Sequence, residues 1–467
     1  MIKLGQTPTP IEYVNTLLDY ANYKSDIVGK KVLENSCGEG NILVEIVRRY
    51  ILDGRRKKWS DEEIRKGMLN DIVGYDVDSK AISTAVYRLN SLCFDLNIQP
   101  IHWNIKQIDY LRQDLLKYDF IIGNPPYVTY HDLSFEQRLY LKDKYQSCKN
   151  GRFDYSYAFI EKSINALSKN GTLSYLVPFS IFRNKYAEVL RKMLLPKLEL
   201  IIDYSGRDVF PNRTIGVAII VCRQYVSDNL SFIKPEGDTD AIIEKKHLLD
   251  RWIFEDDRTL SSNRKFGDYF DIFNSVATLR NSVYLLKEYH IEGQFTVVGD
   301  YRIENQLVYN AVSPRSLKSK KKYKIIFPYY IGKNGVSVIP ENELKCNFSC
   351  CYEYFIQNKI ELEKRKISPN VYWYEYGRSQ ALTSILKEKL IIPMIISGKA
   401  VTHFSKKNEV PYAGYYIVAK TDMLSLDDAA RFIESNDFWE YVKMVGTPTT
   451  KGSYRVSVVD IMEYSLP

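Results

Sequence analysis

The chain has 467 residues, of which 45% are hydrophobic and 26% are charged, and its formal net charge is +8. This composition is typical of a globular protein that is large enough for two or three domains. The sequence contains no apolar run of about 18 residues, and Met1–Gln6 carry no apolar signal core, which argues against a membrane span and against secretion. We therefore predict a cytoplasmic protein with no membrane partner, whose modest positive charge permits a polyanionic one.

The seven cysteines form no CxxC pair, and only five histidines accompany them. Cys346, Cys350 and Cys351 lie close together in the sequence, but no second cysteine or histidine cluster completes a tetrahedral metal site. The sequence therefore predicts reduced thiols and no bound metal.

Hydrophobic spacing predicts that helices and strands alternate along the first half. The expected elements are a helix at 10–22, a strand at 30–34, helices at 41–50 and 60–68, a strand at 71–75, a helix at 80–96, an extended stretch at 98–108, a strand at 118–123, a helix at 156–168, a strand at 172–177, a helix at 184–195, and strands at 198–204 and 216–222. This order predicts a doubly wound α/β domain over residues 1–240, in which the last two strands form an antiparallel pair.

Asn124-Pro125-Pro126-Tyr127 directly follows the apolar strand at 118–123, at the sheet edge where open α/β sheets bind ligands. The prolines remove two backbone donors and keep the neighbouring carbonyls out of a helix. The Asn124 side-chain oxygen and the Pro125 carbonyl can then accept both protons of an exocyclic amine, and Tyr127 offers a stacking face. The alternative is an ordinary turn with an asparagine cap.

The segment Glu34–Gly40 predicts a ligand-binding loop, because Gly38 and Gly40 let the backbone approach a ligand closely. Leu43 stands where a dinucleotide fingerprint has its third glycine, and no phosphate-loop lysine follows, so a nucleotide-like ligand without a phosphate tail fits better. Asp76, at the end of the second strand, is placed to accept ribose hydroxyls, whereas Asp78 suits a helix cap. Asp109 is either a contact for an adenine amine or a solvated loop acid.

These motifs, in this order, resemble the TaqI-type (gamma-class) adenine-N6 DNA methyltransferases, whose fold is a seven-stranded, mostly parallel sheet that binds S-adenosyl-L-methionine. The resemblance also covers 5–10, 153–159 and 209–211, and it implies that Phe210 packs on the flipped adenine, although a plain hydrophobic plug is the alternative. The implied catalytic residues are Asn124, Pro125, Pro126, Tyr127 and Phe210. The implied cofactor contacts are Thr9, Glu34, Ser36, Cys37, Gly38, Gly40, Asp76, Val77, Asp109 and Tyr110.

Residues 241–467 look similar to the target-recognition domains of this family, and we expect an α+β domain that binds double-stranded DNA. Residues 315–324 form a basic stretch, and residues 372–380 interleave aromatic side chains with polar ones that can pair with base edges. A solvated charged face and an aromatic core are the alternatives. The predicted DNA contacts are Lys320, Lys321, Lys322, Arg378 and Gln380.

The resemblance implies a site-specific adenine methyltransferase of a restriction-modification system. The chain begins a few residues before the first motif, so we expect any cognate restriction endonuclease to be a separate chain. Two alternatives stay open. The first is a methyltransferase that acts on RNA bases or on a protein glutamine, since the same tetrapeptide also serves those reactions. The second is a degenerate relative that binds DNA or a partner without turnover.

Overall fold

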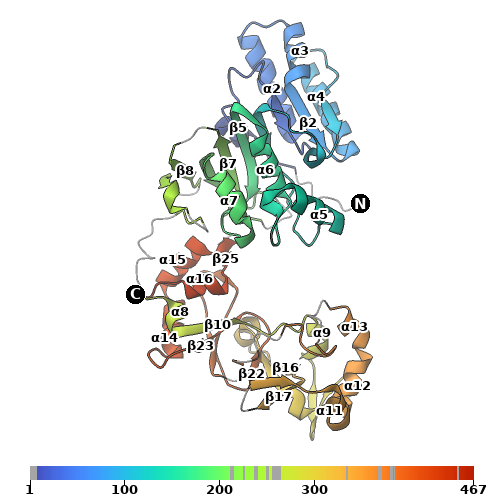
Figure 1. Ribbon diagram of the computed structural model, residues 1–467, viewed down its shortest axis with the longest axis vertical. Coiled ribbons are helices and arrows are strands. Elements are labelled where there is room, and N and C mark those ends of the chain that lie inside the picture. The colour runs from blue at the N-terminus through green and yellow to red at the C-terminus, as the bar shows by residue number, and fades with distance from the viewer. Residues whose placement is uncertain are drawn as a thin grey trace. The chain divides into compact units, whose positions relative to one another are not determined.

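The computed structural model describes residues 8–467 except 211–214, 225–226, 236–239, 249–251, 255–263, 333–334, 366–370, 379–381, 383, 386 and 450–451. The chain divides into two compact units (Figure 1). The first comprises Met1–Phe254 and Thr447–Gly452, and the second comprises Glu255–Gly446 and Ser453–Pro467. The sequence predicted a domain boundary after residue 240, but the first unit extends to residue 254. The reason is that the strand at 241–244 belongs to the sheet of the first unit.

A nine-stranded mixed sheet forms the centre of the first unit, in the order β3-β2-β1-β4-β5-β7-β6-β8-β9. The strands are β1 (Val32–Glu34), β2 (Ile72–Asp76), β3 (Ile105–Gln107), β4 (Tyr118–Gly123), β5 (Leu167–Pro178), β6 (Leu198–Asp203), β7 (Val217–Arg223), β8 (Asn229–Ile233) and β9 (Ala241–Glu244). Strands β1 to β5 pair in parallel, and β7 lies antiparallel between β5 and β6. The predicted doubly wound α/β fold and its antiparallel pair are confirmed.

Helices cover both faces of this sheet, which explains why its central strands are apolar on both sides. One core contains apolar residues of α1 to α4, and a second contains those of α5 to α7. The helices are α1 (Ile11–Tyr20), α2 (Asn41–Arg56), α3 (Asp61–Asp71), α4 (Ser79–Asp95), α5 (Phe135–Lys144), α6 (Ser156–Asn165) and α7 (Glu188–Leu194).

The first unit differs from the sequence-based prediction in two ways. The sheet has nine strands and not seven, because β8 pairs in parallel with β6 and β9 pairs antiparallel with β8. Helix α5 was not predicted, since only Leu141 of its residues is buried and the helix has almost no apolar stripe. A capping box at Ser134 and Gln137 starts this helix and was the available sequence signal.

The second unit is an α+β assembly of small sheets. Its sheets have the orders β10-β23-β19-β21, β11-β16-β15-β22, β12-β13-β14 and β17-β18, and β20 pairs with β25. The strands are β10 (Phe270–Asn274), β11 (Leu285–Leu286), β12 (His290–Glu292), β13 (Phe295–Val298), β14 (Tyr301–Glu304), β15 (Val308–Val312), β16 (Tyr323–Ile326), β17 (Tyr329–Gly332), β18 (Gly335–Val338), β19 (Lys389–Ile392), β20 (Ile395–Ser397), β21 (His403–Ser405), β22 (Glu409–Pro411), β23 (Tyr415–Ala419) and β25 (Ser453–Arg455). The helices are α8 (Phe266–Tyr269), α9 (Asn281–Tyr284), α10 (Pro314–Lys318), α11 (Glu341–Asn347), α12 (Ser349–Gln357), α13 (Lys359–Glu363), α14 (Leu426–Ile433), α15 (Asn436–Val445) and α16 (Val458–Met462). The segment Thr447–Gly452 of the first unit holds β24 (Thr447–Pro448).

The aromatic run at 372–376 belongs mainly to the core of the second unit, which corrects its interpretation as a DNA-binding surface. Tyr374 and Tyr376 are fully buried, and their hydroxyls donate to the carbonyls of Ile339 and Ile326. The buried Arg365 guanidinium donates to the carbonyls of Trp373 and Glu375 and so holds the run in place. Each of these two tyrosines therefore serves as a large apolar core side chain whose hydroxyl makes one hydrogen bond to a backbone carbonyl.

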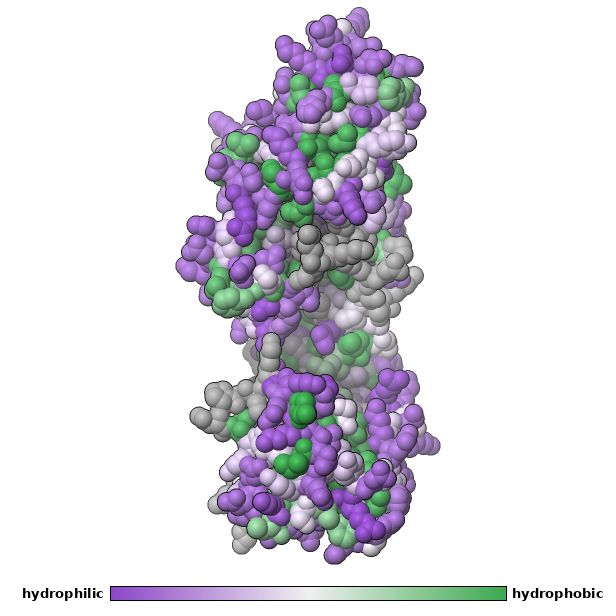
Figure 2. Space-filling view, turned by 90° about the vertical axis from the view of Figure 1, so that its right-hand side faces the viewer, coloured by the Kyte–Doolittle hydropathy of each residue, from purple (hydrophilic) through white to green (hydrophobic). Residues whose placement is uncertain are grey.

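The described part of the chain contains no helix long and apolar enough to cross a membrane. Hydrophilic side chains predominate on the face of the molecule in Figure 2.

Candidate active site

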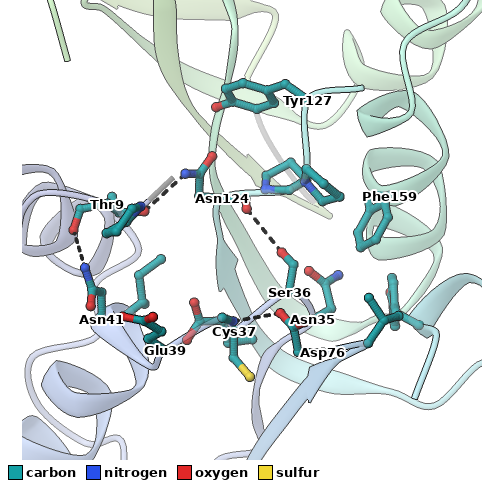
Figure 3. Close-up of a pocket in the computed structure, with 18 of the residues that line it drawn as sticks. Thr9, Asn35, Ser36, Cys37, Glu39, Asn41, Asp76, Asn124, Tyr127 and Phe159 are labelled. Atoms are coloured by element: carbon teal, nitrogen blue, oxygen red, sulfur yellow. Dashed lines mark hydrogen bonds between the residues drawn. The ribbon is translucent and has the colours of Figure 1, made fainter. Parts of the chain in front are cut away.

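A pocket opens in the first unit where β1, β2 and β4 end (Figure 3). Its walls come from the N-terminal segment, from the loops that follow β1, β2, β3, β4 and β6, and from the helices α2 and α6. The lining residues are Pro8, Thr9, Glu34, Asn35, Ser36, Cys37, Gly38, Glu39, Asn41, Ile42, Asp76, Val77, Ile108, Asp109, Tyr110, Asn124, Pro125, Pro126, Tyr127, Tyr155, Phe159 and Phe210. The pocket thus brings together almost every residue that the sequence predicted for the catalytic and cofactor sites.

Asn124 presents one free acceptor to this pocket. Its Nδ2 donates to Thr9 Oγ1 (3.2 Å), and its backbone carbonyl accepts from Ser36 Oγ (3.1 Å) (Figure 3). Its Oδ1 is buried and has no hydrogen-bond partner among the described residues. A buried acceptor without a partner costs free energy, so this oxygen is suited to a ligand that brings an N–H or O–H group.

The glycine loop after β1 has the backbone conformation that its sequence predicts. Gly38 and Gly40 have φ of 50° and 81°, which favours glycine at both positions. A Cβ at Gly40 would lie 3.0 Å from the Cβ of Ala85 on α4, so the loop also packs closely on that helix. Gly38 lines the pocket, whereas Gly40, the N-cap of α2, is not among the described residues that line it.

Asp76 ends β2 and holds the glycine loop as well as lining the pocket. Its Oδ2 accepts from the Gly38 N–H (2.8 Å), and its Oδ1 accepts from the Asp78 N–H (2.9 Å). Asp78 is the N-cap of α4, as predicted, and accepts from the N–H groups of Lys80 and Ala81. The Asp76 carboxylate thus has a structural role that the sequence did not indicate.

Asp109 and Tyr110 enter the pocket from a short 3₁₀ helix, η1 (Tyr110–Arg112). Asp109 caps this helix through the Leu111 N–H (3.0 Å) and pairs with Arg112 (3.3 Å). Tyr110 is buried, which raises the pKa of its hydroxyl to about 12. Lys162 of α6 donates to the carbonyls of Tyr110 and Gln113 (2.5 Å each) and so fixes the loop.

The described pocket lining contains no lysine, arginine or histidine but four acids, Glu34, Glu39, Asp76 and Asp109. Burial raises the pKa of the Glu34 carboxyl well above its usual range, and the nearby Asp76 carboxylate raises it further. Its Oε2 is buried without a hydrogen-bond partner among the described residues. Such a lining disfavours a phosphate and favours a ligand that carries positive charge and hydroxyl donors.

Aromatic rings close the pocket above Asn124. The rings of Tyr127 and Phe210 meet edge to face, with centroids 6.4 Å apart and planes at 68°. Phe210 is only 2% exposed, so it is both a core residue and part of the pocket wall. Tyr155 and Phe159 of the 153–159 motif complete the aromatic lining on the α6 side.

Asn35 and Asn41 line the pocket but were not among the predicted site residues. Asn35 Nδ2 donates to Ser163 Oγ (3.0 Å) and to the Tyr175 hydroxyl (2.5 Å), which ties the loop after β1 to α6 and β5. Asn41 Nδ2 donates to the Thr9 carbonyl (3.1 Å). The available signal was the position of Asn35 inside the predicted loop 34–40 and of Asn41 directly after it. Ile108 was missed because an isolated apolar residue in a loop carries no such signal.

The predicted DNA contacts lie in the second unit. Lys320, Lys321 and Lys322 are exposed between α10 and β16, and Arg378 is exposed after the buried aromatic run. Gln380 lies outside the described residues.

The strand order of the first unit, with its reversed β7 and its pocket at the ends of β1, β2 and β4, is that of an S-adenosylmethionine-dependent methyltransferase fold. The solved structure of the Type IIL restriction-modification enzyme MmeI in complex with DNA has the same fold. It matches with a TM-score of 0.64 at 13% identity, over 97% of this chain and 64% of that one.

Residues 45–210 match the sequence model of the family described as Eco57I restriction-modification methylase. The Type II restriction enzyme and methyltransferase RM.Eco57I of Escherichia coli is 26% identical over 84% of this chain and 49% of its own length. The Type II methyltransferase M.HincII of Haemophilus influenzae is 30% identical over 50% of this chain and 40% of its own. The chain thus spans about half the length of these curated relatives or less.

Proposed function

We propose that this protein is the DNA methyltransferase of a restriction-modification system and that it transfers a methyl group from S-adenosyl-L-methionine to N6 of an adenine flipped out of double-stranded DNA. The observation that carries the proposal is the buried, unpartnered Oδ1 of Asn124 in a pocket that also contains the glycine loop and Asp76. The similarity to RM.Eco57I and M.HincII supports the assignment to a restriction-modification system.

The charge of the pocket supports S-adenosyl-L-methionine as the cofactor. Its lining has four acids and no basic side chain among the described residues, which suits a cationic ligand and not a polyphosphate. Asp76 and Asp109 would hold the ribose and adenine parts, and Thr9, Glu34, Ser36, Cys37, Gly38, Gly40, Val77 and Tyr110 would complete the cofactor site. The cofactor, when bound, supplies an electrophilic methyl group on a sulfonium sulfur.

The residues of the chain prepare the amine for attack. The Asn124 Oδ1 and the Pro125 carbonyl accept its two N–H groups, which favours a tetrahedral nitrogen with its lone pair directed at the methyl donor. Pro126 keeps the turn rigid, and no base has to remove a proton before attack. Extruding a base from a duplex costs a few kcal/mol. Tyr127 and Phe210 offset this cost by about 1–3 kcal/mol per stacking contact.

DNA recognition is assigned to the second unit. Lys320, Lys321 and Lys322 are exposed and adjacent in sequence, as expected for side chains that contact phosphates, and Arg378 is an exposed residue whose guanidinium can pair with base edges. A cognate endonuclease is the proposed partner, and the cytoplasm is the proposed location of the reaction.

A methyl-transfer assay on unmethylated DNA tests this function. The purified protein is incubated with radiolabelled S-adenosyl-L-methionine and genomic DNA from a host that lacks adenine methylation, and the nucleosides are identified by mass spectrometry. We expect N6-methyladenine at one short sequence. Label on cytosine, or no label on the DNA, would contradict the proposal.

A further inference from the structure

Two residues from separate segments hold Asn124 at its two ends. Thr9 Oγ1 accepts from the side-chain Nδ2, and Ser36 Oγ donates to the backbone carbonyl (Figure 3). Thr9 is 5% exposed, so water competes little for its hydroxyl. Both contacts leave Oδ1 as the unpartnered atom of the carboxamide.

The orientation of a carboxamide decides whether it can serve as an acceptor. Its oxygen and nitrogen ends have nearly the same shape, but one accepts and the other donates hydrogen bonds. With Nδ2 bonded to Thr9, the oxygen remains as the unpartnered group of this pocket-lining side chain. A rotation of the amide by 180° would present N–H groups to an incoming amine, and two donors cannot bond to each other.

The position of Thr9 is itself fixed from α2 and α4. Its carbonyl accepts from Asn41 Nδ2 (3.1 Å), and Arg88 donates to Asn41 Oδ1 and to the Glu39 carbonyl. This chain of contacts runs from α4 through the start of α2 to the N-terminal segment. Thr9 is therefore held in place independently of Asn124.

We propose that Thr9 is a positioning residue for methyl transfer, which fixes the Asn124 carboxamide with its oxygen toward the substrate amine, while Ser36 fixes the backbone of the same residue. This role rests on the proposed function and is additional to any contact of Thr9 with the cofactor. A threonine hydroxyl has one proton and two lone pairs. When a ligand acceptor in the pocket takes the proton, only lone pairs face Asn124, and these select its Nδ2.

Rate constants at saturating cofactor separate positioning from cofactor binding. The full chain and its Thr9→Val, Thr9→Ser and Thr84→Val variants are compared in single-turnover methylation of unmethylated genomic DNA, and the cofactor Kd is measured by calorimetry. Thr84 is the matched control, because its hydroxyl donates to the Lys80 carbonyl of its own helix and Thr84 is not among the described residues that line the pocket. Thermal unfolding of each variant checks its folding.

We expect Thr9→Val to lower the single-turnover rate constant about tenfold or more even at saturating cofactor, since the Asn124 Nδ2 donor loses its acceptor. Thr9→Ser should restore most of the rate, and Thr84→Val should leave it unchanged. Ser36→Ala should also slow transfer at saturating cofactor, which gives a second test if Thr9→Val folds poorly.

A Thr9→Val enzyme that reaches the wild-type rate at saturating cofactor, whatever its Kd, overturns the role of Thr9, and so does a Thr9→Ser enzyme as slow as Thr9→Val. In either case an active wild type leaves the proposed function intact. A wild type that methylates no DNA overturns the proposed function and this inference together.

Discussion

The backbone N–H of Gly38 donates a 2.8 Å hydrogen bond to the carboxylate of Asp76, although the two residues lie on different strand-to-helix connections. Asp76 therefore sets the position of the glycine loop at the same time as it lines the pocket. A single carboxylate links the two segments that we assign to the cofactor.

Asp76→Ala should lower cofactor affinity about tenfold or more, because it removes a charged acceptor and releases the Gly38 N–H. Calorimetric titration with S-adenosyl-L-methionine measures the effect. Asp78→Ala is the matched control: it removes the cap of α4, which costs about 1 kcal/mol of stability, but no pocket residue. Equal losses of affinity in both variants would contradict the role of Asp76.

Asn124→Ala should reduce methyl transfer by at least about 100-fold, since it removes a preorganised hydrogen-bonding group at the reacting nitrogen. Cofactor affinity should stay close to that of the wild type. Tyr127→Ala should slow transfer less, because it removes a stacking face and leaves both acceptors. Single-turnover assays measure both variants, and full activity in Asn124→Ala would overturn the mechanism.

Cofactor affinity should rise with pH as Glu34 ionises. Burial raises the pKa of this carboxyl, so it is protonated below the raised value and offers a negative charge to a cationic ligand only above it. Because its pKa is higher in the folded than in the unfolded chain, folding stability contributed by this group falls as the pH rises between the two values.

Glu34→Gln should remove this part of the pH dependence and weaken binding most at high pH. Titrations over a pH series measure it, with Glu39→Gln as a control at an exposed carboxylate that also lines the pocket. A pH profile that Glu34→Gln leaves unchanged would show that Glu34 is not the titrating group.

Lys162→Met should weaken cofactor binding by about 1–3 kcal/mol, because it leaves the carbonyls of Tyr110 and Gln113 without their buried donor. Lys117→Met is the matched control, since Lys117 also donates to two carbonyls, but those of Asn165 and Leu167, which are not among the described residues that line the pocket, whereas Tyr110 is. Calorimetry at constant pH compares the two. The prediction fails if both variants bind the cofactor as the wild type does.

Replacement of Lys320, Lys321 and Lys322 by alanine should weaken DNA binding at all sequences. The slope of log K against log salt should become shallower by about 0.9 for each phosphate that the variant no longer neutralises. Binding is measured by fluorescence anisotropy over a salt series. The control replaces the exposed Lys57, Lys58 and Lys66 of the first unit, which changes the net charge equally. If the slope changes in the control variant but not in the variant of Lys320, Lys321 and Lys322, these three lysines do not contact DNA phosphates.

Local signals in the sequence were sufficient for much of the first unit. Asn124 follows β4 directly, and Gly38 and Gly40 form the turn after β1, because strand ends and glycine turns depend on neighbouring residues. Asp78 caps α4 for the same reason. The doubly wound fold followed from the order of these elements.

The tertiary structure alone decided which polar atoms pair. Thr9 meets Asn124 across 115 positions of sequence, and β8 and β9 extend the sheet through an edge that no local pattern marks. Tyr374 and Tyr376 lie in the core, although exposed aromatic residues would have the same sequence pattern. Residue order sets the conformation of each segment, but long-range packing and hydrogen bonding determine which side chains become buried and which acceptor remains free for a ligand.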